Sequence, residues 1–303
     1  MKDHWISQFY LKGFLDKNSE KLYVFNKKSK IGDLKSPKSI CWSEDYYSLF
    51  NAGFGNERLI DDFFKYEVEN NAAPIIKKIS SDCNCKLTIE DKRKLAVFIS
   101  FLRIRVPKFE KIAKEFVEKP IQDSLKKLSE LNEAENFIKT YEEETGLKSD
   151  MQPDDFLEFI KSYSKDYEAS RNIYFLNRMF SIGNKQVDLI LDMDWSFVYA
   201  SSKRAFITCD NPFVLSSEGK AYSAEIISIM DPAMIKIVPL TKNVCLFIGF
   251  KNSNSFNTYR KFKSFGGKSV RIINTYFIDN SDELIIGSNK NIIQKLLKIE
   301  KII

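Results

Sequence analysis

The sequence predicts an α+β fold, in which a helical layer from the central third packs against a mostly antiparallel sheet from an N-terminal hairpin and the C-terminal third. Apolar residues recur at helical spacing through residues 56–180, whereas strand-like alternation dominates residues 188–303. The helical and the strand-like patterns occupy separate regions of the sequence, which is typical of α+β rather than α/β proteins. No repeat or low-complexity linker interrupts the chain, so we expect residues 1–303 to form a single domain with these two parts.

The N-terminal region predicts short strands. Residues 21–26 alternate in polarity and are followed by lysine-rich turn material containing Gly32 and Pro37, a pattern that predicts a β-hairpin. Residues 46–50 are a further candidate strand, because they are rich in aromatic residues.

The central region predicts helices. Apolar residues from 56 to 79 follow helical spacing, with a kink at Pro74, and a second helix should start at a Thr88 cap. Pro107 should end or bend that second helix. Longer helices are expected over residues 111–144 and 153–180, with a turn between them.

The C-terminal region predicts strands and a final helix. Short runs of aromatic and β-branched residues, bounded by Asn, Pro, Gly or Lys, indicate strands. The helix should occupy residues 291–303. The expected strands are 195–199, 205–208, 234–238 and 244–248.

Composition limits the compartment and the partners. Lys and Arg total 47 against 41 Asp and Glu, so the net charge of +6 permits a nucleic-acid or nucleotide partner without requiring one. Five cysteines lack framework spacing, and the first residues lack the apolar core of a signal peptide, which predicts a reducing cytoplasm. No apolar run is long enough to span a bilayer, so no membrane association is expected. A protein partner or a homo-oligomer stays open.

The sequence also limits the chemistry. His4 is the only histidine, which excludes sites that need several imidazoles, and we find no zinc motif, Walker motif or dinucleotide-binding motif. The cofactor is therefore unknown, although acidic residues around the 56–79 helix leave Mg²⁺ or Mn²⁺ open. Most of those carboxylates should simply form the solvated face of that helix.

His4 and Gln8 form the first candidate catalytic pair. The two residues would share one face if the segment were helical, so that the amide could orient a ligand while the imidazole exchanged protons. The alternative is that both residues only satisfy buried backbone groups among the surrounding aromatic residues.

Asp210 is the second candidate catalytic residue. It follows a predicted strand within the turn Thr208-Cys209-Asp210-Asn211-Pro212, and such a turn can present an acid, a base or a metal ligand. The alternative is that Asp210 caps its own loop.

Two basic features could bind a substrate. Arg105 lies on an apolar helix, where it could hold a phosphate, although internal ion pairing with the acidic helix is the alternative that we favour. Residues 259–268 mix cations, including Lys261 and Lys263, with aromatic rings, as single-strand binding surfaces do. The alternative for this stretch is an exposed amphipathic helix that stops at glycine; the Gly266-Gly267 pair could otherwise cradle a phosphate.

Three motifs together resemble a bacterial family known as domain of unknown function 4238. They are the His4 to Phe14 segment, Arg105-Val106-Pro107 and the Thr208 to Pro212 turn. This chain differs from the resembled pattern at Ser7, where the family usually has proline, and at Leu102, where glutamine is expected. The resemblance supplies no activity.

The resemblance does imply that several distant residues belong to one constellation. These residues are His4, Arg105, Asp210, Asn211 and Asn274. Imidazole, guanidinium and carboxylate groups together suit phosphate-containing substrates. We therefore expect a nuclease-like or phosphodiesterase-type hydrolase, of the phage-defence or toxin kind that scattered bacterial occurrence suggests. The alternatives are a non-catalytic module that recognises a nucleotide, a peptide or nucleic acid, or an assembly component.

Overall fold

The computed structural model describes residues 2–44, 46–47, 58–128, 130–146, 148–201, 204–217, 220–222, 229–259, 261 and 263–302. Contacts divide the chain into two compact units. The larger unit contains residues 1–47, 58–109 and 179–303, and the smaller unit, as far as it is described, lies within residues 110–178. Whether the chain behaves as a single domain stays a prediction.

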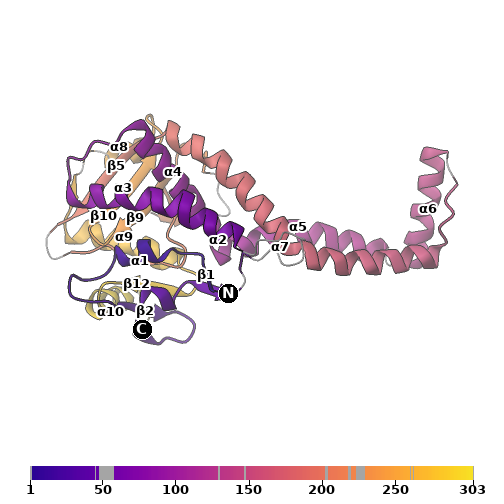
Figure 1. Cartoon of the computed structure of the whole chain (residues 1–303), viewed down its shortest axis with the longest axis horizontal. Coiled ribbons are helices and arrows are strands. Elements are labelled where there is room, and N and C mark those ends of the chain that lie inside the picture. The colour runs from indigo at the N-terminus through magenta and orange to yellow at the C-terminus, as the bar shows by residue number, and fades with distance from the viewer. Residues whose placement is uncertain are drawn as a thin grey trace. The chain divides into compact units, whose positions relative to one another are not determined.

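The chain is an α+β protein, as the sequence predicts. Helices dominate its middle and antiparallel strand pairs dominate its ends (Figure 1). The strands, in chain order, are β1 (Lys2–His4), β2 (Leu22–Asn26), β3 (Gly32–Lys35), β4 (Trp42–Glu44), β5 (Asp194–Ala200), β6 (Thr208–Cys209), β7 (Val214–Ser217), β8 (Lys220–Tyr222), β9 (Ile235–Thr241), β10 (Val244–Gly249), β11 (Ser264–Phe265) and β12 (Leu284–Gly287).

The helices expected in the central region and at the C-terminal end are present, and α9 is an additional long helix that the sequence did not predict. In the described residues, two short irregular turns accompany the helices, a 3₁₀ turn η1 (Pro37–Ser39) and a π-helical turn η3 (Phe64–Glu69). The α-helices are α1 (Gln8–Lys12), α2 (Leu59–Phe63), α3 (Asn70–Ser81), α4 (Ile89–Ile104), α5 (Pro107–Leu128), α6 (Leu131–Thr145), α7 (Pro153–Asp192), α8 (Asn254–Tyr259), α9 (Gly267–Asn280) and α10 (Lys290–Ile299).

The described strands form three sheets rather than one. The predicted hairpin of β2 and β3 exists, but it joins β12 and β6 in a four-stranded sheet of order β3-β2-β12-β6. The C-terminal strands form a separate six-stranded sheet, β11-β5-β10-β9-β7-β8, and β1 pairs with β4. Among the described strands, only the β11–β5 pair is parallel.

Strands β9 and β10 form the centre of the six-stranded sheet. Every residue of both strands is buried, as expected for strands that are covered on both faces. Alternate residues of β9, Ile235 and Ile237, belong to the core cluster that also contains α9 residues. Helix α3 contacts both α4 and β9 (Figure 1). Residues of β9 therefore pack with α3 as well as with the core cluster that contains α9.

The smaller unit is helical in the described residues. It contains α6 together with parts of α5 and α7, whose apolar residues include Ala134, Phe156 and Ile160. The rings of Phe137 and Phe156 stack with centroids 5.1 Å apart. Gly146 ends α6 with a φ of 69°, a left-handed conformation that glycine adopts without steric cost.

Three predicted elements differ in detail. The predicted strand 205–208 is strand only from Thr208, because Asn274 bonds the backbone N–H of Ile207 in place of a neighbouring strand. Gly266 and Gly267 begin helix α9 rather than stopping a helix. The candidate strand at 46–50 falls mostly outside the described residues, and residues 46–47 form a turn.

The predicted start of α4 is confirmed by a reciprocal cap. The Thr88 hydroxyl accepts the backbone N–H of Asp91 at 3.0 Å, and the Asp91 carboxylate accepts the backbone N–H of Thr88 at 3.1 Å. This arrangement satisfies two backbone donors that the first turn of a helix otherwise leaves unpaired.

Thr88→Ala should lower the free energy of unfolding by about 1 kcal/mol, because the cap loses its side-chain acceptor. Urea titration followed by circular dichroism measures the change. Thr88→Ser is the matched control, since it keeps the hydroxyl. If the two variants were equally stable, the cap would contribute nothing.

Candidate functional site

A cavity of about 700 Å³ surrounds His4 in the larger unit. We call it the His4 cavity. Its walls come from the β1–α1 segment, the η1 turn and the α2–η3 region, and they include four lysine or arginine side chains. The lining residues are Lys2, His4, Ser7, Gln8, Lys38, Ser39, Trp42, Arg58, Asp61, Lys65 and Glu69.

His4 and Gln8 both line this cavity, although they do not share a helix. His4 ends strand β1, where it pairs with Trp42 of β4, and Gln8 is the first residue of α1. The proposed pairing on one helical face is therefore wrong. The β-strand places His4 on the cavity wall, and the turn that follows brings Gln8 to the same wall.

The hydrogen bond of His4 indicates its tautomer. Its Nε2 lies 3.3 Å from the carbonyl oxygen of Lys38, which can only accept, so Nε2 carries the proton and Nδ1 keeps its lone pair. Burial lowers the pKa of His4 below its usual 6.5, while the Lys38 carbonyl and the charge of Asp61 partly oppose that shift. The imidazole is therefore neutral at pH 7 and can accept a proton.

Arg105 lies beside the cavity in an internal ion pair. Its side chain is 1% exposed, and its Nη1 donates to Glu69 Oε1 at 2.9 Å, so the favoured expectation of pairing with the acidic helix is confirmed. The guanidinium also stacks over the ring of Phe64. Burial raises the pKa of Glu69, while the charge of Arg105 opposes the shift.

Unsatisfied donors mark this region. The Nε and Nη2 atoms of Arg105 and the hydroxyl of Ser7 are buried and have no hydrogen-bond partner among the described residues. Ser7 also lines the His4 cavity. Because buried polar groups in native proteins are nearly always hydrogen-bonded, an unpaired hydroxyl at a cavity wall is a position where a ligand or water can bind.

The basic side chains of the His4 cavity are held in different ways. Lys2 Nζ lies 4.1 Å from the centroid of the Trp42 ring, and Arg58 donates to Asp61 at 3.1 Å. Lys38 and Lys65 are exposed at their side chains, and Lys65 contacts the Tyr66 hydroxyl. The cavity therefore presents cations to a ligand from several sides.

Asp210 lines a different cavity of about 410 Å³. This cavity shares Ser39 and Trp42 with the His4 cavity, so the two are neighbours. It is otherwise lined by different residues, among them Trp5, Cys41 and Lys108.

The Asp210 carboxylate is engaged by backbone groups. Both of its oxygens accept backbone N–H groups, from Asp282 at 2.9 Å, Glu283 at 2.7 Å and Leu284 at 2.8 Å. Burial raises its pKa, and these three hydrogen bonds oppose the shift. Asp210 thus holds a segment far along the chain rather than capping its own loop.

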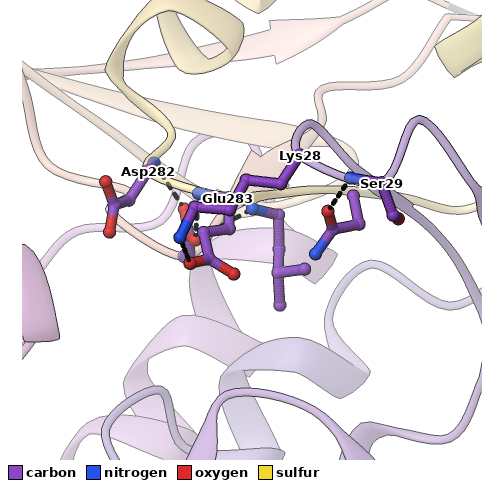
Figure 2. Close-up of polar contacts among 7 residues, drawn as sticks. Lys28, Ser29, Asp282 and Glu283 are labelled. Carbon is purple, nitrogen blue, oxygen red and sulfur yellow. Dashed lines mark hydrogen bonds and ion pairs between the residues drawn. The ribbon is translucent and has the colours of Figure 1, made fainter.

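The segment that Asp210 holds is also fixed from β2 and the turn after it. Figure 2 shows Lys28 beside Glu283, with which it forms an ion pair, and Asp282 next to it. Lys27 Nζ donates to the carbonyl of Ser281 at 2.8 Å. These contacts and the Asp210 carboxylate together fix the backbone that leads into β12.

Asn211 and Asn274 are also engaged by backbone groups. Asn211 Nδ2 donates to the carbonyl of Asn280 at 3.4 Å, and Asn280 returns a bond of 2.7 Å to the Asn211 carbonyl. Asn274 accepts from Ile207 N–H at 3.1 Å and donates to the Ala205 carbonyl at 3.0 Å. Neither residue lines the His4 cavity, so the structure brings together only part of the expected constellation.

Lys261 and Lys263 line neither the His4 cavity nor the cavity beside Asp210. Both side chains are exposed, and Lys263 Nζ reaches Asn84 at 3.5 Å. Arg260 and Phe262, which belong to the same predicted basic and aromatic stretch, lie outside the described residues.

No group of three or more His, Cys, Asp and Glu residues within the described part of the chain could hold a metal ion. The Mg²⁺ or Mn²⁺ expectation stays a prediction. No helix in that part is long and apolar enough to cross a bilayer.

A family model described as "Protein of unknown function (DUF4238)" matches residues 2–291. The chain belongs to the DUF4238 family. The match confirms the family resemblance drawn from the three motifs. Comparisons with curated proteins and with solved structures gave no match.

Sequence reasoning missed most of the His4 cavity wall in this DUF4238 protein. The four basic residues of this wall belong to no sequence motif, and in the sequence each resembles an ordinary surface charge. They are Lys2, Lys38, Arg58 and Lys65. Glu69 is one of several carboxylates of the 56–79 helix, and the expected pairing of Arg105 with that helix did not identify which of them is the partner. A usable signal was the buried Arg105, since a buried guanidinium requires a carboxylate partner, and the acidic helix nearby supplies one.

Glu69→Gln should lower the free energy of unfolding by about 3 kcal/mol, because it leaves the buried guanidinium of Arg105 without a carboxylate. Chemical denaturation measures this. Glu67→Gln is the matched control, since it removes the same charge from an exposed position two residues away. Equal stability of the two variants would contradict the assigned ion pair.

Asp210→Asn should lower the free energy of unfolding by about 2 kcal/mol, because the amide cannot accept all three backbone N–H groups. Asp282→Asn is the control, since that side chain is exposed and its backbone N–H is unchanged. The control should stay within about 0.5 kcal/mol of the parent. A loss of the same size in both would overturn the anchoring role of Asp210.

Proposed function

We propose that this chain is a cytoplasmic phosphodiesterase or nuclease-like hydrolase, with the His4 cavity as its active site. The observation that carries the proposal is a neutral imidazole, bonded through Nε2 to the Lys38 carbonyl, in a cavity that four lysine or arginine side chains line together with Asp61 and Glu69. A phosphodiester is an anion that needs both charge stabilisation and an activated water.

The cavity cations would bind the phosphate. Lys38 and Lys65 reach the cavity with exposed ammonium groups, and Arg58 offers a planar guanidinium. These residues take the role that sequence analysis gave to Arg105, whose Nη1 is already bound to Glu69. Arg105 then acts as a positioning residue, because it fixes the carboxylate of Glu69 at the cavity wall.

His4 would act as the general base. Its Nδ1 accepts a proton from water, the water oxygen forms a bond to phosphorus, and the opposite P–O ester bond breaks. The leaving oxygen takes a proton from solvent, so the products are an alcohol and a phosphate monoester. Gln8 and the unpaired Ser7 hydroxyl are placed to hydrogen-bond the substrate or the water.

His4→Gln should lower kcat at least about 100-fold with little change in KM, because the variant loses the base but keeps the cations. Release of p-nitrophenolate from bis(p-nitrophenyl) phosphate measures both constants. Lys65→Ala should instead raise KM, and Lys77→Ala, a lysine that does not line the cavity, is its matched control.

The pH profile provides an independent check. The base must be neutral, so kcat/KM should rise with pH through the lowered pKa of His4 and level off above it, with the acidic limb below pH 6.5. That limb should disappear in His4→Gln. Binding of the diester without turnover in the parent protein would replace the hydrolase with the alternative of a recognition module.

A further inference from the structure

A third cavity, of about 610 Å³, carries a cluster of positive charge. We call it the basic cavity. It shares no residue with the His4 cavity. Four of its lining residues are cationic, and none of the described lining residues is acidic. The lining residues are Arg204, Ala205, Gly267, Lys268, Val270, Arg271, Asn274, Asn291, Ile292, Lys295, Leu296 and Ile299.

The four cations come from three separate parts of the fold. Arg204 precedes β6, Lys268 and Arg271 lie on α9, and Lys295 lies on α10. Within the described residues none of these side chains forms an ion pair or a hydrogen bond. Surface lysines and arginines usually stand among acidic residues, so four uncompensated cations around one hollow create a local positive potential.

The backbone at this cavity permits close approach of a ligand. Gly267 is the first residue of α9, and a Cβ there would lie 2.8 Å from Arg204 Nε, so the guanidinium lies directly against the glycine backbone. Gly267, one of the two glycines that the sequence marked as a candidate phosphate cradle, therefore lines this cavity beside Lys268.

Part of the lining of the basic cavity is apolar. Val270, Ile292, Leu296 and Ile299 line it, and the Ile299 side chain is among the exposed large hydrophobic residues. A lining that combines apolar and basic side chains matches a ligand that combines an uncharged planar or aliphatic part with phosphate. The volume suits a single nucleotide unit, because pockets of about 300 to 1,000 Å³ hold ligands of that size.

The positive surface continues into a neighbouring cavity of about 780 Å³. The two cavities share Arg204, Ala205 and Ile292, and the second adds Lys17 and Lys242. Lys242 is paired with Asp16 at 2.7 Å, whereas Lys17 is exposed. A ligand with more than one phosphate can therefore contact cations along both hollows.

We propose that the basic cavity is a binding site for a nucleoside phosphate, with phosphate on Arg204, Lys268, Arg271 and Lys295 and the base or sugar against the apolar lining residues. The nucleoside phosphate is either free or a unit of a single nucleic-acid strand, since both present the same chemistry. This inference goes beyond the proposed hydrolase and does not depend on it.

The test is fluorescence anisotropy with two probes, a fluorescein-labelled 12-nucleotide oligo-dT and a fluorescent ATP analogue, on the full chain. The variant is R271E/K295E, and the matched control is K21E/K251E, which makes the same charge change at exposed lysines outside the basic cavity. The cavity variant should weaken binding of a probe at least about 30-fold, and the control should change it less than about 3-fold. For the strand, the slope of log K against log salt should also fall by about 0.7 per lost phosphate contact.

The outcomes separate the sources and the proposals. Selective loss of oligo-dT binding identifies a strand as the ligand, and selective loss of ATP-analogue binding identifies a free nucleotide. Equal weakening in the cavity variant and the control, or no binding of either probe to the parent protein, overturns the site. Lys268→Gln, a milder change, repeats the test if R271E/K295E shows altered circular dichroism.

Hydrolysis of bis(p-nitrophenyl) phosphate provides the cross-check, because that small substrate needs only the His4 cavity. Activity in R271E/K295E should equal that of the parent protein. The binding test can therefore support the basic cavity as a ligand site even if the protein hydrolyses no diester. Hydrolysis at the His4 cavity can likewise be found even if the basic cavity binds neither probe.

Discussion

The asparagine side chains of α9 hold the segment that links the two larger sheets. This segment leaves the four-stranded sheet at β6 and enters the six-stranded sheet at β7. The backbone N–H of Asp210 still bonds the Leu284 carbonyl of β12, but residues 211–213 belong to no strand. Asn274 bonds the backbone before β6, and Asn280 donates to the carbonyls of Asn211 and Phe213. Because buried backbone groups must be paired, α9 supplies the partners that a strand would otherwise supply.

The need to pair these backbone groups explains why Asp210, Asn211 and Asn274 have structural roles. Asp210 lies in the same linking segment and accepts three N–H groups, two from residues before β12 and one from its first residue. The carboxylate and the two asparagines join segments that are distant in sequence. Side chains that bond such segments must match the positions of the backbone groups, so a sequence motif can be distinctive without contacting a ligand.

The N-terminal motif has a different physical character. His4, Ser7 and Gln8 face a cavity, and the Ser7 hydroxyl is buried without a described partner. The family usually has proline at this position, so this chain carries a polar group that the family pattern lacks. Unpaired donors and basic walls on one cavity are features of binding rather than of folding.

Much of the fold could be predicted because its signals are local. The spacing of apolar residues predicted α4, and the Thr88 cap gave its first residue. Helix α9 was missed, since its apolar residues follow a basic stretch and its two opening glycines resemble a stop signal. The division into separate sheets was also missed, because strand pairing joins residues far apart, such as Ile286 with Val24.

The candidate site, like the fold, could be predicted only in part. The sequence by itself determined the α+β class, the family and the scarcity of imidazoles, because composition, periodicity and contiguous motifs carry that information. Only the tertiary structure decided that Arg105 pairs with Glu69, that Asp210 is engaged by backbone groups, and that four scattered cations surround one hollow. Those outcomes depend on which distant segments share a cavity or need a buried partner, and chain folding alone sets those distances.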